Sequence, residues 1–293
     1  MRKHPLALAV GVSALIVGVF ALVFMTMGKN PEKSLFSDKV GVIEIIATIT
    51  DSRKINRDLK AFRLDDSIKA VVIRIDSPGG GAAASQEIFS EVKRLARAKP
   101  VVCSMGAVAA SGGYYIASAC SKIVANPSTM TGSIGVIISF PDLKELFDKL
   151  GIKMQTVKSG ALKGTGDISR PLNPAERAML QAAIDDTHAQ FVKDVAETRK
   201  MPLARVQDLA TGGIYTGRMA KNLGLVDTLG GFETAVKMAA DMAGIKDTPQ
   251  LMRPESAKKN WVDRMFEEKA EWLIQRIKLE LYGRGLDYRW QID

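Results

Sequence analysis

Histidine is scarce in this sequence, and its scarcity limits the catalytic groups that the chain can hold. His4 and His188 are the only histidines among 293 residues. His4 precedes a long apolar run, and His188 lies within a predicted helix, where a surface or core position is the ordinary interpretation. A Ser-His-Asp triad needs a histidine within hydrogen-bond reach of its serine. The sequence therefore argues against that mechanism.

Cysteine is equally sparse. Cys103 and Cys120 are the only two, which excludes a disulfide framework and leaves a single bridge open. Cys103 lies in the apolar run 101–103, where a buried and inert thiol is expected. The sequence also lacks zinc-knuckle spacing. We expect neither a cofactor nor a bound metal.

Low-complexity tracts and blocks of like charge are absent, although the chain is basic overall. Its formal net charge is +9, and the 25% of residues that are charged are scattered along the sequence. A scattered excess fits work beside anionic lipid about as well as nucleic-acid binding. Because no aromatic RNA-binding motif accompanies the basic residues, we expect no nucleic acid among the partners.

The longest hydrophobic run lies at the N-terminus. Residues 6–27 carry no charge and reach the roughly 20 residues that a membrane-spanning helix needs. Arg2 and Lys3 precede the run, which favours a cytoplasmic N-terminus and places the rest of the chain on the other side. The run exceeds a typical signal-peptide core, and residues 24–27 offer no small-x-small cleavage site. We predict an uncleaved, single-pass anchor rather than a cleaved signal peptide.

The sequence predicts four parts: an anchor over 1–28, a linker over 29–38, a catalytic domain over 39–245 and a C-terminal amphipathic helical extension over 246–293. In the third part, β-branched runs alternate with segments of helical periodicity, which indicates an α/β fold with a parallel sheet of right-handed βαβ-type units. Strands are predicted over 40–49, 71–75, 100–104, 122–125 and 133–138, with a strand-like run over 153–157. Helices are predicted over 54–64, 82–98, 111–119, 141–150 and 174–199.

Two small-residue segments follow predicted strands and suit a catalytic site. Residues 77–81 (Ser-Pro-Gly-Gly-Gly) form a turn that opens a helix, where glycines permit close backbone approach and N–H groups attract negative charge. They match neither a Walker loop nor a dinucleotide motif. Residues 105–115 surround Ser111 with alanines and glycines, and the N–H of Gly112 follows in position to donate to an oxyanion. Taken alone, a tight turn or small-residue packing explains each segment equally well.

A serine nucleophile needs a base, and without a suitable histidine the remaining candidate is a lysine that burial keeps neutral. Lys163 is distinctive because it lies in the Gly-rich loop 159–164, after the strand-like run 153–157. The residues alone do not choose it from the other lysines, since a solvated loop position explains it as well.

Five motifs supply a family resemblance. From about residue 40 to 243 the chain resembles signal peptide peptidase A of the short bacterial form, and more distantly the Clp protease and crotonase superfamily. The matching motifs, in order, are residues 76–81, 109–115, 131–136, 158–163, and 215–218 with 224–227. The resemblance implies a Clp/crotonase-like parallel sheet with repeated β-β-α units, preceded by one transmembrane helix.

The resemblance also implies a role for individual residues. Ser111 matches the nucleophile and Lys163 the general base, which together form a serine–lysine dyad. Ser133 matches the hydroxyl that orients the lysine amine. Gly80 and Gly112 match the backbone positions of the oxyanion hole.

The sequence departs from the family around the lysine. Leu162 precedes Lys163 where an aromatic is usual, and residues 164–168 replace a Lys-Asp-x-Gly-Ser-Pro run. The lysine itself is kept.

The function implied is that of a membrane-anchored serine endopeptidase that degrades apolar peptides, such as signal peptides left after protein export. The implied location is the bacterial inner (cytoplasmic) membrane, with the catalytic domain on the periplasmic or extracellular side. In the double-length form of the family the lysine and the serine lie in different halves. By analogy, we expect a homo-oligomeric ring in which neighbouring subunits complete each dyad.

Three other functions and the C-terminal segment remain open. The first is a stomatin-partner type membrane serine protease. The second is a crotonase-like acyl-CoA hydratase or isomerase, which would need a carboxylate near the position of Ser111. The third is a catalytically inactive membrane scaffold. Residues 257–282 place apolar side chains on one helical stripe, which indicates packing on the body or a neighbouring subunit, or a helix lying on the membrane.

Overall fold

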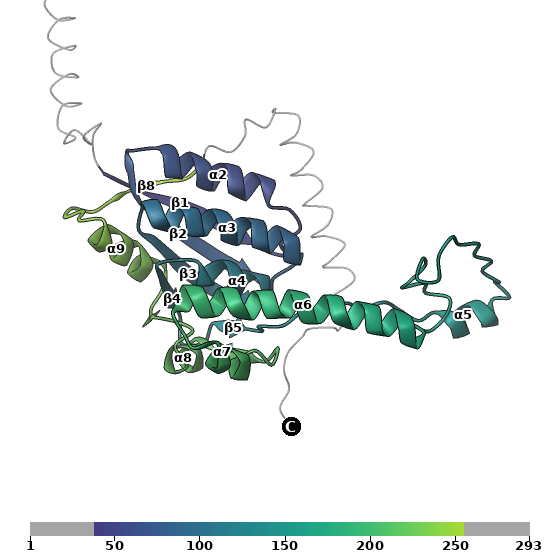
Figure 1. Ribbon diagram of the computed structural model, residues 1–293. Helices are drawn as coiled ribbons and strands as arrows, with labels where there is room; N and C mark the ends of the chain where they lie inside the picture. The colour runs from purple at the N-terminus through teal and green to yellow at the C-terminus, as the bar shows by residue number, and fades with distance from the viewer. Residues whose placement is uncertain (1–37, 255–293) are drawn as a thin grey trace, which may run out of the picture. The chain divides into compact units, whose positions relative to one another are not determined.

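A single sheet forms the centre of the computed structural model, which describes residues 38–254 (Figure 1). The strand order is β6-β5-β3-β2-β1-β8, with β4 paired to β3 and to β7. All pairs are parallel except β5 with β6. The strands are β1 (Lys39–Ile46), β2 (Ile68–Ser77), β3 (Val101–Ala110), β4 (Lys122–Ala125), β5 (Met130–Gly132), β6 (Ile214–Thr216), β7 (Thr228–Leu229) and β8 (Gln250–Met252). The fold class is therefore the predicted one, α/β with a largely parallel sheet.

Helices cover both faces of this sheet, because side chains alternate between the faces along each strand. Val71 and Ile73 belong to a large apolar cluster that includes buried residues of α2, α3, α4 and α6. Val72 points the other way and packs with Ala235 and Ala239 of α9. The helices are α2 (Arg53–Leu64), α3 (Ala82–Ala98), α4 (Gly112–Ser118), α5 (Lys144–Lys149), α6 (Pro174–Arg199), α7 (Leu203–Leu209), α8 (Gly217–Asn222) and α9 (Phe232–Met242).

Two different strands, β4 and β5, pair with the same edge of strand β3. Residues 102–104 pair with β4, and residues 108–110 pair with β5. Val102 also pairs with Val72 of β2, so β4 and β5 both lie on the side of β3 opposite β2. The arrangement leaves the carboxyl end of β3 between β2 and β5.

Helix α6 begins with a capping box and then extends beyond the body. The Asn173 side chain accepts from the Glu176 N–H, and the Glu176 carboxylate accepts from the Asn173 N–H. After Glu176, the next buried residue of α6 is Phe191. Figure 1 shows α5 and the chain around it beyond the N-terminal end of α6, away from the sheet.

Two predicted strands are wrong. Residues 133–138 are irregular, because Gly132 and Ser133 have φ values of 80° and 49° and turn the chain out of the sheet after β5. Residues 153–157 are also irregular, and Val157 is fully exposed, so this run has no strand beside it in the described chain. The predicted strand 40–49 ends early, at Ile46, where Ala47 takes a φ of 64°.

The cysteines are buried free thiols, as expected for Cys103. Burial raises the pKa of Cys120 far above its usual value, and the neighbouring Cys103 thiol adds to the shift.

The predicted anchor, the linker up to residue 37 and the C-terminal stripe 257–282 lie outside the described residues. Among residues 38–254, no helix combines the length and the hydrophobicity needed to cross a bilayer.

Candidate active site

Three turns meet at one edge of the sheet. Strands β2, β3 and β5 run parallel side by side, so their carboxyl ends lie together. The turn 78–81 follows β2, Ser111 follows β3, and Ser133 follows β5. Residues from all three turns line one cavity of about 830 Å³.

Ser111 occupies a strained turn between β3 and α4. Its φ of 51° and ψ of −120° belong to a region that residues with a side chain rarely enter. Two backbone hydrogen bonds hold it there: the Ser111 N–H donates to Gly132 O at 2.9 Å, and the Tyr115 N–H donates to Ser111 O at 2.8 Å. Such a turn presents a side chain at the end of a strand, which suits a nucleophile.

Two N–H groups beside Ser111 are free to bind an anion. Gly80 and Gly112 donate to no acceptor within residues 38–254. Gly80 needs glycine, because a Cβ there would lie 2.1 Å from the backbone atom Ile49 O, and a Cβ at Gly112 would lie 2.4 Å from the side-chain atom Ser85 Oγ. Free N–H groups beside a serine are the kind of donor that an oxyanion hole uses.

Ser133 also has a left-handed backbone. Its φ is 49°, and its N–H donates to Gly213 O at 2.8 Å. The loop 210–213 thereby holds Ser133 at the cavity wall, half-buried.

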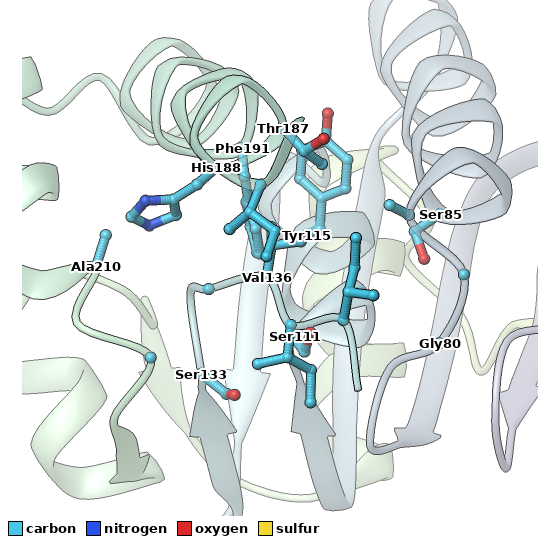
Figure 2. A pocket seen from close by; sticks show the side chains of 18 of the residues that line it. Gly80, Ser85, Ser111, Tyr115, Ser133, Val136, Thr187, His188, Phe191 and Ala210 are labelled. Carbon is cyan, nitrogen blue, oxygen red and sulfur yellow. The ribbon is translucent and has the colours of Figure 1, made fainter. Parts of the chain in front are cut away.

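Helix α6 forms the opposite wall of the cavity. Figure 2 shows Thr187, His188 and Phe191 on this wall, with Ser111 and Ser133 across the cavity. Phe191 packs on Tyr115, with ring centroids 4.6 Å apart, and Tyr115 stacks on Phe89 at 4.5 Å.

The Tyr115 hydroxyl, on α4, donates a hydrogen bond to Asp194 Oδ2 of α6. Burial and this bond both raise the pKa of Tyr115, so its phenol stays protonated. The tyrosine thus fixes α6 over α4.

Lys163 is not brought to Ser111 within this chain. It is exposed, it is not among the residues that line the cavity, and its N–H donates to Gly160 O at 3.1 Å. Its loop belongs to the irregular segment 151–170, near α5 and the start of α6.

That loop is nevertheless fixed to α6. Arg170 donates to both carboxylate oxygens of the fully buried Glu176, at 2.8 and 2.6 Å, and to Gly164 O at 3.2 Å.

Among the cavity residues that the sequence does not predict, His188 and Ser85 each have a buried polar atom without a partner in the described chain. The ordinary interpretation of His188 is a surface or core position, yet it lines the same cavity as Ser111, and its Nε2 is buried without a partner among residues 38–254. Ser85 was not singled out, although it lies one helical turn after Gly81 and lines the cavity too. Only the packing of α3 and α6 around the strand ends places these two residues there.

Comparison with known proteins identifies the family. The sequence pattern described as Peptidase family S49 matches residues 93–246, and that of Clp protease matches residues 33–131. A Synechocystis sp. protein described as a protease is 42% identical over 217 residues, which are 73% of this chain and 78% of that protein. The chain belongs to peptidase family S49.

A second relative and one solved structure are also similar to the chain. The chloroplastic serine protease SPPA of Arabidopsis thaliana is 39% identical over 188 residues, which are 64% of this chain and 28% of that longer protein. The membrane-bound stomatin-specific protease 1510-N is 18% identical, with a TM-score of 0.52 over 76% of this chain and 100% of that one. The second likeness is one of fold alone. As an S49 member of the SppA type, the chain is a serine protease.

Proposed function

We propose that the chain is a membrane-anchored endopeptidase that uses a serine–lysine dyad to degrade apolar peptides at the membrane surface. Ser111 is the nucleophile, Lys163 the general base, Ser133 the hydroxyl that orients the lysine, and Gly80 and Gly112 the oxyanion hole. The observation that supports this proposal most directly is the setting of Ser111. It has a strained backbone at the end of a strand, it lines a cavity, and two N–H groups without an acceptor in the described chain lie beside it.

The proposed reaction has two steps. Ser111 Oγ attacks the peptide carbonyl carbon while its proton moves to the neutral amine of Lys163. The N–H groups of Gly80 and Gly112 bind the oxyanion, and the C–N bond then breaks as the lysine passes its proton to the leaving amine. Water then attacks the acyl carbonyl carbon while Lys163 takes its proton, and the ester bond breaks as the lysine passes that proton to Ser111 Oγ and the carboxyl product leaves.

We propose further that Lys163 serves a neighbouring copy of the chain. A lysine surrounded by water holds its proton at neutral pH, whereas burial favours the neutral amine that a base must be. Lys163 is exposed in the single chain and remote from the Ser111 cavity. A homo-oligomeric ring would bury the segment 151–170 and place the Lys163 amine at the Ser111 cavity of the next subunit.

The remaining features of the proposal are the anchor, the location and the domains. Residues 6–27 hold the catalytic domain, 39–245, at the outer surface of a bacterial inner membrane, where signal peptides remain after export. The shared edge of β3 supports a Clp/crotonase-type sheet with repeated β-β-α units.

The test is hydrolysis of a fluorogenic, signal-peptide-like substrate by the full chain in detergent micelles. We expect the wild type to cleave, Ser111→Ala and Lys163→Ala to lose activity, and Lys153→Ala, an exposed lysine of the same segment, to retain it. An active Lys163→Ala variant would place the base elsewhere. A wild type inert on a panel of peptides would favour the inactive scaffold.

A further inference from the structure

The hydroxyl of Ser85 is buried without a hydrogen-bond partner. The residue is 1% exposed, and its Oγ bonds no atom of the described chain. A serine inside a helix commonly donates to the carbonyl one turn earlier. Here Gly81 O accepts the Ser85 N–H at 3.0 Å, while the hydroxyl stays unpaired. Burying an unpaired hydroxyl is unfavourable, so most buried polar groups have partners.

The position of this hydroxyl suggests its partner. A Cβ built on Gly112 would lie 2.4 Å from Ser85 Oγ and 3.4 Å from Gly80 N. The hydroxyl and the free N–H of Gly80 therefore approach the same side of Gly112, next to Ser111. Figure 2 shows Ser85 on the α3 side of the cavity beside Gly80, with His188 on the opposite side.

The oxyanion of the intermediate can accept one more hydrogen bond than the two N–H groups supply. A substrate carbonyl oxygen has two lone pairs, whereas the oxygen of a tetrahedral intermediate has three and carries a full charge. Gly80 and Gly112 provide two N–H groups. A third donor at this point would act on the intermediate more than on the substrate, and such differential binding accelerates a reaction.

We propose that Ser85 is a catalytic residue whose hydroxyl donates a third hydrogen bond to the oxyanion. The inference rests on the proposed function, since it needs Ser111 to form a tetrahedral intermediate. In the free protein the hydroxyl is desolvated and unpaired; in the intermediate it is paired with a charge. The Ser85 hydroxyl thus lowers the stability of the free protein and stabilises the transition state.

The test compares Ser85→Ala with wild type in the full chain in detergent micelles. We expect kcat to fall about 10- to 100-fold with KM nearly unchanged, because one oxyanion donor is lost. We expect Tm to stay equal or rise, because an unpaired buried hydroxyl has been removed. Ser90→Ala, an exposed serine of the same helix, is the matched control and should change neither quantity.

A second measurement separates catalysis from substrate binding. A peptide aldehyde adds to Ser111 and forms an oxyanion, so its affinity should fall with Ser85→Ala in proportion to kcat/KM. Binding of the uncleaved peptide, measured in the Ser111→Ala background, should not change. Unchanged kcat, or an activity loss that tracks a lower Tm, would overturn the role of Ser85 while leaving the serine–lysine proposal standing. An inert wild type would overturn both.

Discussion

At the scale of single residues, the site depends on how little space surrounds Gly112. Its neighbours at the Cβ position are Ser85 Oγ at 2.4 Å and Ser85 Cβ at 3.2 Å. The first contact is a severe clash, and the second is one that a small movement relieves. The cost of a methyl group at position 112 is therefore set by the hydroxyl of Ser85.

Gly112→Ala should destabilise the protein by about 1–3 kcal/mol, as overpacking of a tight interior commonly does. In a Ser85→Ala background the clashing oxygen is gone, so the same substitution should cost clearly less. Urea unfolding of the four proteins of this double-mutant cycle measures the difference. Equal costs in the two backgrounds would show that the hydroxyl does not limit the space at Gly112. Gly80→Ala is the contrast, because its clash at 2.1 Å is with the carbonyl of Ile49 and no side-chain change relieves it.

At the scale of elements, helix α6 joins the cavity wall to the segment that carries Lys163. Arg170 is the link, since it binds Glu176 in the first turn of α6 and the carbonyl of Gly164, the residue after the lysine. The Arg170 guanidinium is the main reason that the pKa of Glu176 falls from 4.5 to about 2, and the N–H of Asn173 adds to the shift. The charged carboxylate is thus the form that the folded protein stabilises.

The sign of the resulting pH dependence follows from this lowered pKa. The contribution of Glu176 to stability is fully present above pH 4.5 and is lost as pH falls toward about 2. Glu176→Gln should therefore be less stable than wild type at pH 7, and the gap in Tm should close across that acidic window. Glu233→Gln, in the first turn of α9 and without an ion pair in the described chain, is the control. A gap in Tm that is the same at pH 7 and pH 3 would contradict the assignment.

How far sequence predicts structure can be judged from these same elements. Helix α6 has the predicted bounds, and Asn173, Pro174 and Glu176 at its start are local signals that act within one turn. The predicted strand 133–138 is wrong. Ser133 has a positive φ, and its N–H donates to Gly213 O, a residue far along the chain that no local pattern reveals. His188 and Ser85 were not predicted at the cavity for the same reason: tertiary packing puts them there.

At the scale of the whole molecule, exposed apolar side chains are concentrated in residues 137–168, a stretch that includes Lys163. Of the eighteen large hydrophobic residues that are exposed in the described chain, ten fall between Ile137 and Ile168, and Val157 is fully exposed. Exposed apolar surface gathered in this way commonly marks a protein–protein interface. The same segment carries the proposed base, so burying it against a second copy would bring the lysine out of water as well.

A mixing experiment tests this assembly directly. Ser111→Ala and Lys163→Ala are each expected to be inactive, but co-expressed in equal amounts they should regain activity, because some sites then combine an intact serine with a neighbour's intact lysine. In a closed ring with random order, about a quarter of the sites should be complete. The matched control pairs Ser111→Ala with the Ser111→Ala, Lys163→Ala double variant, which contains no intact serine. If the first mixture is as inactive as this control while wild type cleaves, each chain must complete its own site, and Lys163 must reach Ser111 by a rearrangement of the segment 151–170.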